Sequence, residues 1–303
     1  MRLFKVSALV LFGVIGALAI LMTVLLSAKD KDDGVAKELV VVSGMTRADI
    51  AKQLSEDSLI KSQFAFFLYL KMIQANVLPG TYEISSSDSA SAIADNLARA
   101  KFKTAKITII EGWRVEDIET YLLDEKKLTG TAGFAAKAAV FEGYLFPDTY
   151  EVQIEITADE LIELMRENFI ERTSELAVTP ETINLASIIE REAKSDGERA
   201  AIAGVYVNRL EIGMNLQADA TVQYAKGNWK SVSVADYTAV ISPYNTYLNA
   251  GLPPGPICNP GLASIRAVLE PEDHDYFYYF HAKGETIFSK TAAEHSAKVR
   301  QYF

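Results

Sequence analysis

The stretch from residue 6 to residue 26 limits the possible folds of this chain more than any other feature. It comprises 21 consecutive residues without a charged side chain, and its most polar members are Ser7 and Thr23. At about 1.5 Å of rise per residue, a helix of this length reaches about 31 Å, which matches the roughly 30 Å hydrocarbon core of a bilayer. We therefore predict a single transmembrane helix over residues 6–26.

A cleaved signal peptide is the alternative interpretation of the same stretch. Signal peptides usually have a shorter apolar region, of about 7–15 residues, followed by a small-x-small cleavage site. Leu26-Ser27-Ala28 matches such a site poorly. Both features favour a retained span.

The orientation of the span rests on weaker signals. Two basic residues precede it and two follow it closely, so the positive-inside bias is slight. Because the tail before the span is short, we expect a cytoplasmic N-terminus and an extracytoplasmic remainder. The single cysteine, Cys258, is compatible with that location.

The amino-acid composition excludes several classes of function for this chain. The chain is 49% hydrophobic and 23% charged, which excludes wholesale disorder. Its formal net charge of -10 argues against a sequence-independent nucleic-acid binder, which would need a basic surface. One cysteine excludes an intrachain disulfide and a cysteine-rich metal site, and His274, His281 and His295 lack zinc-site spacing, so we expect no zinc site.

The part of the chain after the span divides into two mixed α+β segments, residues 29–104 and 105–303. Alternating and helical hydrophobic patterns define their elements. In the first segment we expect strands at 38–42 and 81–84, a helix ending near 54, and helices at 63–73 and 90–100. In the second we expect a strand at 105–110, helices at 158–175, 180–194 and 197–211, a hairpin of 276–280 and 285–288, and a last helix from 292.

The helix predicted over residues 180–194 carries the strongest sign of chemistry. Leu185, Ile188 and Ile189 form an apolar stripe at i, i+3 and i+4, and the next position on it is Glu192. A carboxylate on a buried face is costly unless it is paired or protonated, and desolvation raises its pKa. A general acid needs this property near neutral pH.

Two structural interpretations of Glu192 compete with the catalytic one. It could form a buried ion pair with an arginine such as Arg199 or Arg209, or the helix end could fray into solvent. Glu190 lies about 200° away around the helix and must face elsewhere. The pattern by itself leaves these alternatives open.

Other segments give weaker signals. Residues 242–247 gather polar and aromatic groups in a predicted loop, which is compatible equally with a ligand site and with a structural loop. We interpret the aromatic run at 276–280 as a buried strand rather than a sugar platform. No G-x-S-x-G motif and no P-loop occurs in the sequence.

Several of these segments, in this order, resemble the endolytic peptidoglycan transglycosylase family called MltG or YceG-like. They are residues 142–150 (EGYLFPDTY), 186–192 (ASIIERE), 198–199, 208–210 (NRL), 213–224, 242–247 and 251–261. The likeness covers the whole chain. It implies a cytoplasmic tail and transmembrane helix at 1–28, a small LysM-like α+β domain at 29–104, and a larger α+β catalytic domain at 105–303.

The resemblance also assigns residues to the site. The family's catalytic acid is the second glutamate of its E-x-E pair, which here is Glu192. Six further residues are candidates for substrate binding because they lie in the family's motifs: Glu190, Gln217, Asp219, Tyr224, Asn245 and Tyr247. The sequence departs from the family at Ala220, where proline is usual, and at Thr286, where many members have histidine.

The implied reaction is non-hydrolytic cleavage of the β-1,4 bond between N-acetylmuramic acid (MurNAc) and N-acetylglucosamine (GlcNAc) in nascent peptidoglycan. It would leave 1,6-anhydroMurNAc ends, limit strand length and require no metal or cofactor. The implied location is the bacterial cytoplasmic (inner) membrane with the catalytic domain outside, and cell-wall synthases are candidate partners. The LysM-like domain either binds glycan or spaces the catalytic domain from the bilayer.

Two other functions stay open at this point. One is a muramidase hydrolase that uses Glu192 and Asp219 as its two carboxylates. The other is a non-catalytic peptidoglycan-binding scaffold.

Overall fold

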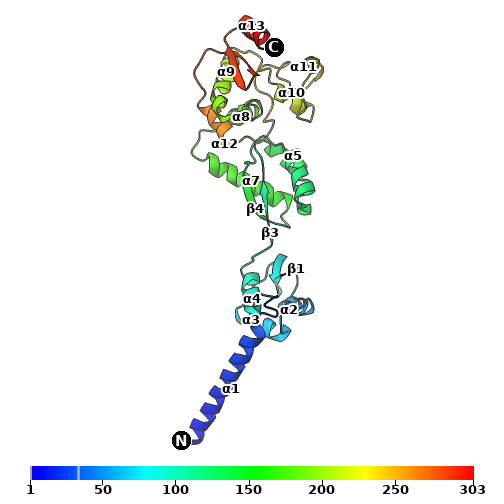
Figure 1. Cartoon of the computed structure of the whole chain (residues 1–303), viewed down its shortest axis with the longest axis vertical. Helices are drawn as coiled ribbons and strands as arrows, with labels where there is room; N and C mark the ends of the chain where they lie inside the picture. The colour runs from blue at the N-terminus through cyan, green and yellow to red at the C-terminus, as the bar shows by residue number, and fades with distance from the viewer. Residues whose placement is uncertain (1, 33–34) are drawn as a thin grey trace. The chain divides into compact units, whose positions relative to one another are not determined.

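The computed structural model describes residues 2–32 and 35–303, and it describes side chains for residues 13–32 and 35–303. It divides the chain into two compact units (Figure 1). Unit 1 comprises Met1–Ala105 with Gln153–Glu155, and unit 2 comprises Lys106–Val152 with Ile156–Phe303. Both units combine helices and strands, so the α+β class is confirmed. The LysM likeness and the domain boundaries at 28 and 104 stay predictions.

Unit 1 is a small sheet covered by helices. Its elements are α1 (Arg2–Leu26), β1 (Ala36–Val41), α2 (Arg47–Glu56), α3 (Gln63–Met72), β2 (Gly80–Ser85) and α4 (Ala90–Ala98). β1 and β2 pair antiparallel with Leu39 opposite Tyr82, and both side chains are fully buried against α2, α3 and α4. Thr46, Ser62 and Ser89 cap the three helices by accepting hydrogen bonds from backbone N–H groups of the first turn.

The predicted membrane span is not established by the structure. Among the residues whose side chains are described, no helix has the length and apolarity needed to cross a bilayer. Residues 6–12 of the expected span lie outside the described side chains.

Unit 2 contains the remaining elements, and its strands form two small sheets, β3–β4 and β5–β6. The strands are β3 (Thr104–Thr108), which starts at the unit boundary, β4 (Thr149–Gln153), β5 (Tyr278–Ala282) and β6 (Glu285–Ser289). The α-helices are α5 (Val115–Thr120), α6 (Phe134–Ala138), α7 (Ala158–Thr173), α8 (Pro180–Glu192), α9 (Arg199–Glu211), α10 (Asp219–Ala225), α11 (Asp236–Ala239), α12 (Leu262–Leu269) and α13 (Ala292–Tyr302). A π-helical turn, η1 (Tyr121–Glu125), and the 3-10 turns η2 (Thr129–Thr131), η3 (Ala139–Phe141) and η4 (Asp196–Glu198) complete the unit.

α8 is the central helix of unit 2. Every residue from 182 to 189 is buried, and α8 packs against α9, α10 and α12. Thr179 caps its N-terminus with a capping box, and Pro180 occupies the first turn, where no N–H donor is needed. The helix ends at Glu192, two residues earlier than the hydrophobic pattern predicts, because Ala193 has an extended backbone (ψ 134°).

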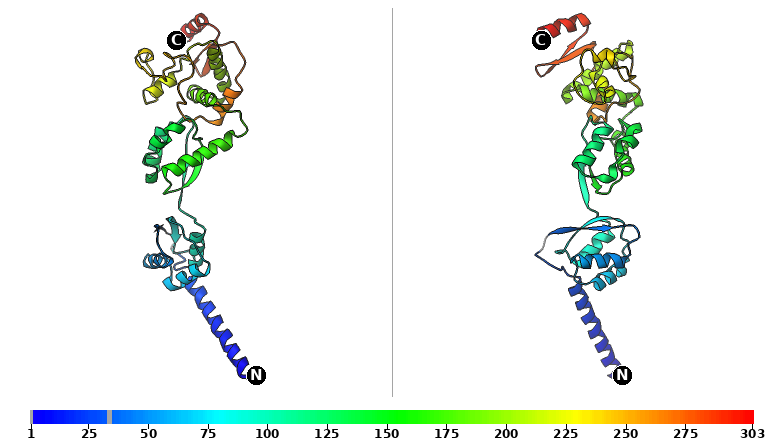
Figure 2. Two further views of the ribbon diagram at one scale, coloured as in Figure 1. Left: turned by 180° about the vertical axis from the view of Figure 1, so that it is seen from behind. Right: turned by 90° about the vertical axis from the view of Figure 1, so that its right-hand side faces the viewer.

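The C-terminal hairpin also differs from the prediction. β5 occupies 278–282 instead of 276–280, and residues 278–281 are only partly buried rather than buried. The turn lies at Lys283 and Gly284, both with positive φ, as expected for a tight hairpin. Figure 2 shows this hairpin, in orange-red, beside α13.

A glycine in the loop before β4 gives a stability prediction. Gly143 has φ +88°, and a Cβ there would lie 2.5 Å from Pro256 Cβ and 3.0 Å from Ile183 Cγ2. We expect Gly143→Ala to lower the free energy of unfolding by about 2 kcal/mol or more, from backbone strain plus overpacking. Urea denaturation followed by circular dichroism measures this change.

Gly133→Ala is the matched control. Gly133 has a similar φ of +82°, but its Cβ would meet nothing within 4 Å. It should lose only about 1 kcal/mol, the cost of the backbone strain alone. Equal losses in both variants would show that the contact with Pro256 is unimportant.

Candidate active site

Glu192 lies where α8 leaves the core. The eight residues before Glu190 are buried, whereas Glu192 is only partly buried, at the point where the helix gives way to extended chain. Helices α9 and α10 and strand β5 surround this end of α8 (Figure 1). The residue that the hydrophobic periodicity of this helix singled out, Glu192, therefore lies at the edge of a packed core.

One tyrosine contacts the Glu192 carboxylate, and a second tyrosine contacts the first. The hydroxyl of Tyr279, in β5, donates a hydrogen bond of 2.8 Å to Glu192 Oε2. The hydroxyl of Tyr206, in α9, lies 3.0 Å from that of Tyr279, and Tyr206 is 1% exposed. This chain of hydroxyls fixes one carboxylate oxygen and the direction of the side chain.

Burial raises the pKa of Glu192 above its ordinary value, and the negative charge of Asp219 raises it further. The hydrogen bond from Tyr279, another from the backbone N–H of Ala220 and the positive charge of Arg209 act in the opposite direction. Burial is the largest effect, so the site stabilises the protonated form of Glu192 relative to that of an exposed glutamate. A group in this state can donate a proton.

Asp219 is the first residue of α10 and belongs to a second polar group at the site. Its Oδ1 accepts a 2.6 Å hydrogen bond from the Tyr247 hydroxyl, and its Oδ2 lies 3.5 Å from the Tyr237 hydroxyl. The rings of Tyr237 and Tyr247 are stacked, with centroids 3.9 Å apart and planes at 13°. Burial, followed by the hydrogen bond to Asp219, raises the pKa of Tyr247, so its hydroxyl remains a donor.

Gln217 precedes α10 and has an unusual backbone. Its φ is +52°, a left-handed conformation that costs a non-glycine residue about 1 kcal/mol or more. Its backbone N–H donates to the carbonyl oxygen of Thr246, while its side chain is exposed. The loop thus directs an amide group outward beside Asp219.

Glu190 has internal contacts instead of an open face. Its Oε1 accepts from Arg199 at 3.1 Å, and its Oε2 accepts from the backbone N–H of Gly261 and from Ser264 Oγ. Its side chain is 5% exposed. These contacts join α8 to the N-terminus of α12 and argue against the predicted role of Glu190 in substrate binding.

Asn245 and Tyr224 also have internal partners. Asn245 is fully buried, donates to the carbonyl oxygens of Tyr237 and Val240, and accepts from the backbone N–H of Tyr247. It therefore shapes the loop that presents the two stacked tyrosines. Tyr224 lies about 140° around α10 from Asp219, and its ring packs on Tyr244 at 4.7 Å between centroids. Of the residues predicted to bind substrate, the structure thus brings Asp219 and Tyr247 together near Glu192, and Gln217 lies exposed two residues before Asp219.

The hairpin position with the unusual threonine is connected to the same end of α8. Thr286 donates a hydrogen bond to Glu198 Oε2, and its hydroxyl lies 2.9 Å from His281 Nδ1. His281 Nε2 lies 3.2 Å from the backbone oxygen of Glu192. Thr286 therefore supports His281, which touches the backbone of the acid.

Tyr279, Tyr206 and Tyr237 were missed by the sequence analysis. In β5, Tyr279 and His281 are two residues apart and both reach Glu192, as side chains on one face of a strand do. That alternation was present in the sequence, but nothing in it related residue 279 to residue 192. Among the described residues, no group of three or more histidine, cysteine or acidic side chains is arranged to hold a metal ion.

Comparison with known proteins identifies the family. The profile of the YceG-like family matches residues 39–301 of this chain. The chain belongs to the YceG-like family. This confirms the resemblance that the motifs carry.

Relatives of this YceG-like chain have names that state an activity. A Bacillus subtilis protein named endolytic murein transglycosylase is 32% identical over 316 aligned residues, which cover 92% of this chain and 88% of the relative. A Streptococcus pneumoniae protein of the same name is 32% identical over 176 residues, covering 53% of this chain and 32% of the relative. A crystal structure of a yceG-like protein from Listeria monocytogenes superimposes with a TM-score of 0.54 at 30% identity, over 86% of this chain and 98% of that one.

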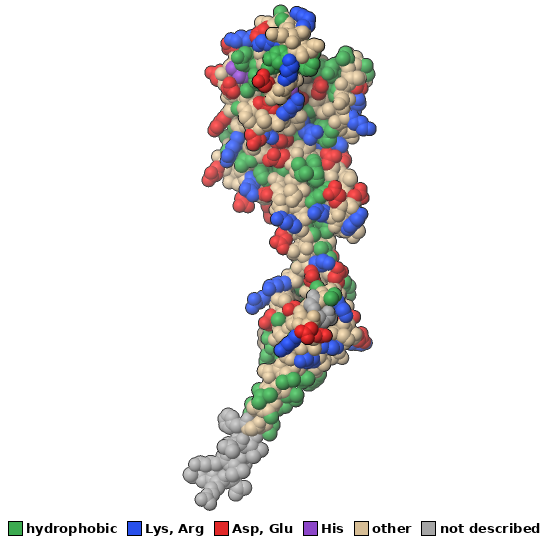
Figure 3. All heavy atoms as spheres, viewed as in Figure 1, with side chains coloured by type: hydrophobic (Ala, Val, Ile, Leu, Met, Phe, Trp, Pro, Cys, Tyr) green, Lys and Arg blue, Asp and Glu red, His purple; other side chains and the backbone are tan. Residues whose placement is uncertain are grey.

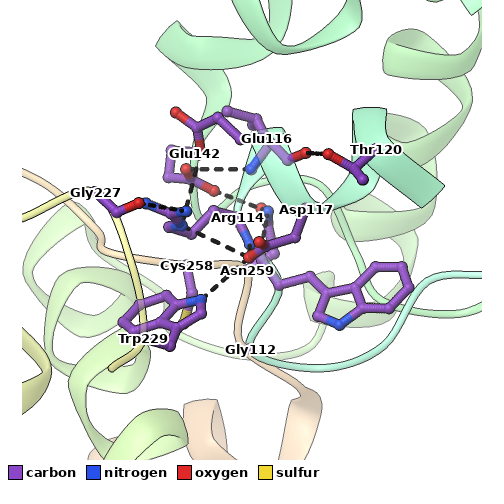
Figure 4. Close-up of polar contacts among 12 residues, drawn as sticks. Gly112, Arg114, Glu116, Asp117, Thr120, Glu142, Gly227, Trp229, Cys258 and Asn259 are labelled. Atoms are coloured by element: carbon purple, nitrogen blue, oxygen red, sulfur yellow. Dashed lines mark hydrogen bonds and ion pairs between the residues drawn. The ribbon is translucent and has the colours of Figure 1, made fainter. Parts of the chain in front are cut away.

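A second buried carboxyl of this YceG-like chain lies away from Glu192, in the EGYLFPDTY segment. Glu142 is 7% exposed, accepts a 2.9 Å hydrogen bond from Asn259 Nδ2, and lies 3.4 Å from the backbone N–H of Val115 (Figure 4). Burial raises the pKa of Glu142 to about 8, and the nearby charge of Arg114 offsets little of this effect. Glu142 joins the start of α5 to the loop before α12.

This arrangement predicts a pH dependence of stability. The folded protein holds the Glu142 proton up to about pH 8, whereas an unfolded chain releases it near pH 4.5. The folded state thus binds more protons between these values, and its stability must fall as pH rises, by up to about 1.4 kcal/mol per pH unit. We expect Glu142→Gln to remove this contribution.

Urea denaturation of both proteins at pH 5, 6.5 and 8 measures the difference. Other groups contribute equally to both, so the stability of wild type relative to the variant should decline steadily with pH. A constant difference would show that Glu142 ionises at its ordinary pH in the folded protein.

Proposed function

We propose that this chain is a membrane-anchored endolytic murein transglycosylase that cleaves the MurNAc–GlcNAc bond within peptidoglycan strands. The observation that carries the proposal is Glu192, a partly exposed residue at the end of a buried helix, whose carboxyl has a raised pKa and accepts a hydrogen bond from Tyr279, which Tyr206 supports in turn. The relatives named endolytic murein transglycosylase support this reaction.

One acid is sufficient for this chemistry. Glu192 protonates the glycosidic oxygen as the bond to C1 of MurNAc breaks. The carboxylate that remains accepts the proton of the C6 hydroxyl of the same sugar, whose oxygen attacks C1 and closes the 1,6-anhydro ring. Because the nucleophile belongs to the substrate, the attack is intramolecular and gains a high effective concentration.

The second polar group has a defined part in this mechanism. Cleavage develops positive charge at C1 and the ring oxygen, and the Asp219 carboxylate stabilises such charge electrostatically. The hydroxyl of Tyr247 fixes the orientation of Asp219 at 2.6 Å. The stacked Tyr237 and Tyr247 rings offer an aromatic face to a sugar, and the exposed Gln217 amide offers hydrogen bonds.

The apolar sequence at residues 6–26 supports an anchor in the bacterial cytoplasmic membrane with both units on the outer side. An anchored enzyme acts on glycan close to its synthesis, which fits the termination of nascent strands and makes cell-wall synthases candidate partners. The LysM-like unit either binds glycan or acts as a spacer.

The catalytic acid is tested with uncrosslinked glycan strands and mass spectrometry. We expect wild type to give products lighter by one water than hydrolysis products, and Glu192→Gln to lose at least about 10³-fold in rate, as removal of a general acid does. Glu181→Gln, on the exposed first turn of the same helix, is the matched control and should retain full activity.

The same assay separates the alternatives. Asp219→Asn should be slower by about 10- to 100-fold and still form anhydro products. Water-containing products from wild type would indicate a hydrolase that uses both carboxylates. Glycan binding without turnover in any folded form, including the full chain in lipid, would indicate a scaffold.

Tyr279 gives a separate prediction about pH. Its hydrogen bond lowers the pKa of Glu192, so Tyr279→Phe should raise that pKa further. Because Glu192 must start protonated, the alkaline limb of the kcat/KM profile should move to higher pH. The rate at the optimum should fall about tenfold, because the carboxyl loses its fixed orientation.

The control is Tyr276→Phe. Tyr276 lies three residues before Tyr279, and its ring stacks on Phe288. It should leave the pH profile unchanged. An unchanged alkaline limb in folded Tyr279→Phe would mean that Glu192 is not the group that sets it.

A further inference from the structure

One face of α3 is apolar and exposed, although unit 1 has a well-packed core. Phe64, Leu68 and Met72 follow one another at spacing i, i+4, i+8 and are 72%, 40% and 68% exposed. They lie along one side of the helix. The opposite side supplies Phe66 and Leu70 to the core, so the exposed side is not needed for folding of the unit.

The same end of unit 1 receives α1. Leu26 packs against the core cluster of unit 1, α1 contacts α3 and α4, and Lys61 Nζ donates a 2.7 Å hydrogen bond to Ser27 Oγ. Figure 3 shows green hydrophobic side chains over the described part of α1 and over the adjoining end of unit 1. The helix that carries the exposed face is therefore next to the end of α1.

The surface of α1 indicates what covers this region. Its exposed large side chains are all hydrophobic over the described turns: Val14, Ile15, Leu18, Ile20, Leu21 and Val24, each 51–68% exposed. A helix that is apolar on all sides needs apolar surroundings, and for the anchor proposed above these are lipid chains. The Phe64 face continues this surface.

Charge specifies the kind of lipid. Between Asp57 and Glu83 the only charged side chains are Lys61 and Lys71, in a chain with a formal net charge of -10. Both lysines are exposed; Lys61 lies two residues before α3 and Lys71 lies in its last turn. An apolar helix face flanked by lysines is typical of a segment that lies in the interface of an anionic bilayer.

We propose that the Phe64–Leu68–Met72 face of α3 inserts into the headgroup region of an anionic membrane and holds unit 1 against the bilayer. Unit 1 is then a membrane-surface element and not a freely moving spacer. This inference rests on the proposed anchor, but it does not depend on the catalytic reaction.

The test uses the full chain in vesicles of phosphatidylglycerol and phosphatidylcholine that contain a spin-labelled quencher lipid. An environment-sensitive fluorophore is attached to a cysteine placed at one of three positions; Cys258 is fully buried and does not compete. Ile20→Cys reports on α1 and Phe64→Cys on the α3 face. Val40→Cys is the matched exposed control; it lies in β1, a strand that Figure 1 draws at the end of unit 1 remote from α1.

We expect lipid quenching and a blue-shifted emission at positions 20 and 64, and neither at position 40. Quenching at 64 should fall at least about twofold when Leu68 and Met72 are changed to Gln, or in vesicles of phosphatidylcholine alone. Val42→Gln, another exposed change in unit 1, should have no effect.

Three results would overturn the proposal. If position 20 is quenched and position 64 is quenched no more than position 40, the anchor is supported and the proposed insertion of the α3 face is wrong. Absence of quenching at all three positions would remove both. A signal at 64 that follows protein concentration and ignores the quencher lipid would assign the face to a second copy of the chain.

Discussion

The burial of α8 is the constraint on which the rest of unit 2 depends. Residues 182–189 are buried on every side, so α9, α10 and α12 must arrange themselves around this helix. Its last residue, Glu192, then lies at a fixed point where the buried helix gives way to partly exposed chain. Tyr279, in β5, contacts Glu192, and Tyr206, in α9, contacts Tyr279.

The sequence predicted the parts of this arrangement that depend on local spacing. The cap at Thr179, the stripe that leads to Glu192 and the opposite direction of Glu190 all follow from a period of 3.6 residues. The helix end was placed two residues too late, since hydrophobic periodicity does not report the extended backbone of Ala193. Element boundaries of this kind depend on tertiary packing.

The sequence pattern could not predict contacts between segments that are far apart in the chain. Glu192 and Tyr279 are 87 residues apart, and the pattern contains no information on how the hairpin packs against α8. Motif membership also does not separate side chains that meet a ligand from those that hold a loop. Asn245 and Asp219 both belong to the motifs. Asn245 donates its hydrogen bonds to backbone carbonyl oxygens, whereas Asp219 faces two tyrosine hydroxyls.

Three glutamates of unit 2 show that burial does not define an acid by itself. Glu190 is neutralised by Arg199 and has all its partners inside the protein. Glu142 has a pKa raised to about 8, but it is 7% exposed and holds two segments together. Only Glu192 among the three combines a raised pKa with partial exposure and a second carboxylate nearby. A proton can leave a desolvated carboxyl for a sugar only where the sugar can reach it, so access decides which of these groups can act as the catalyst.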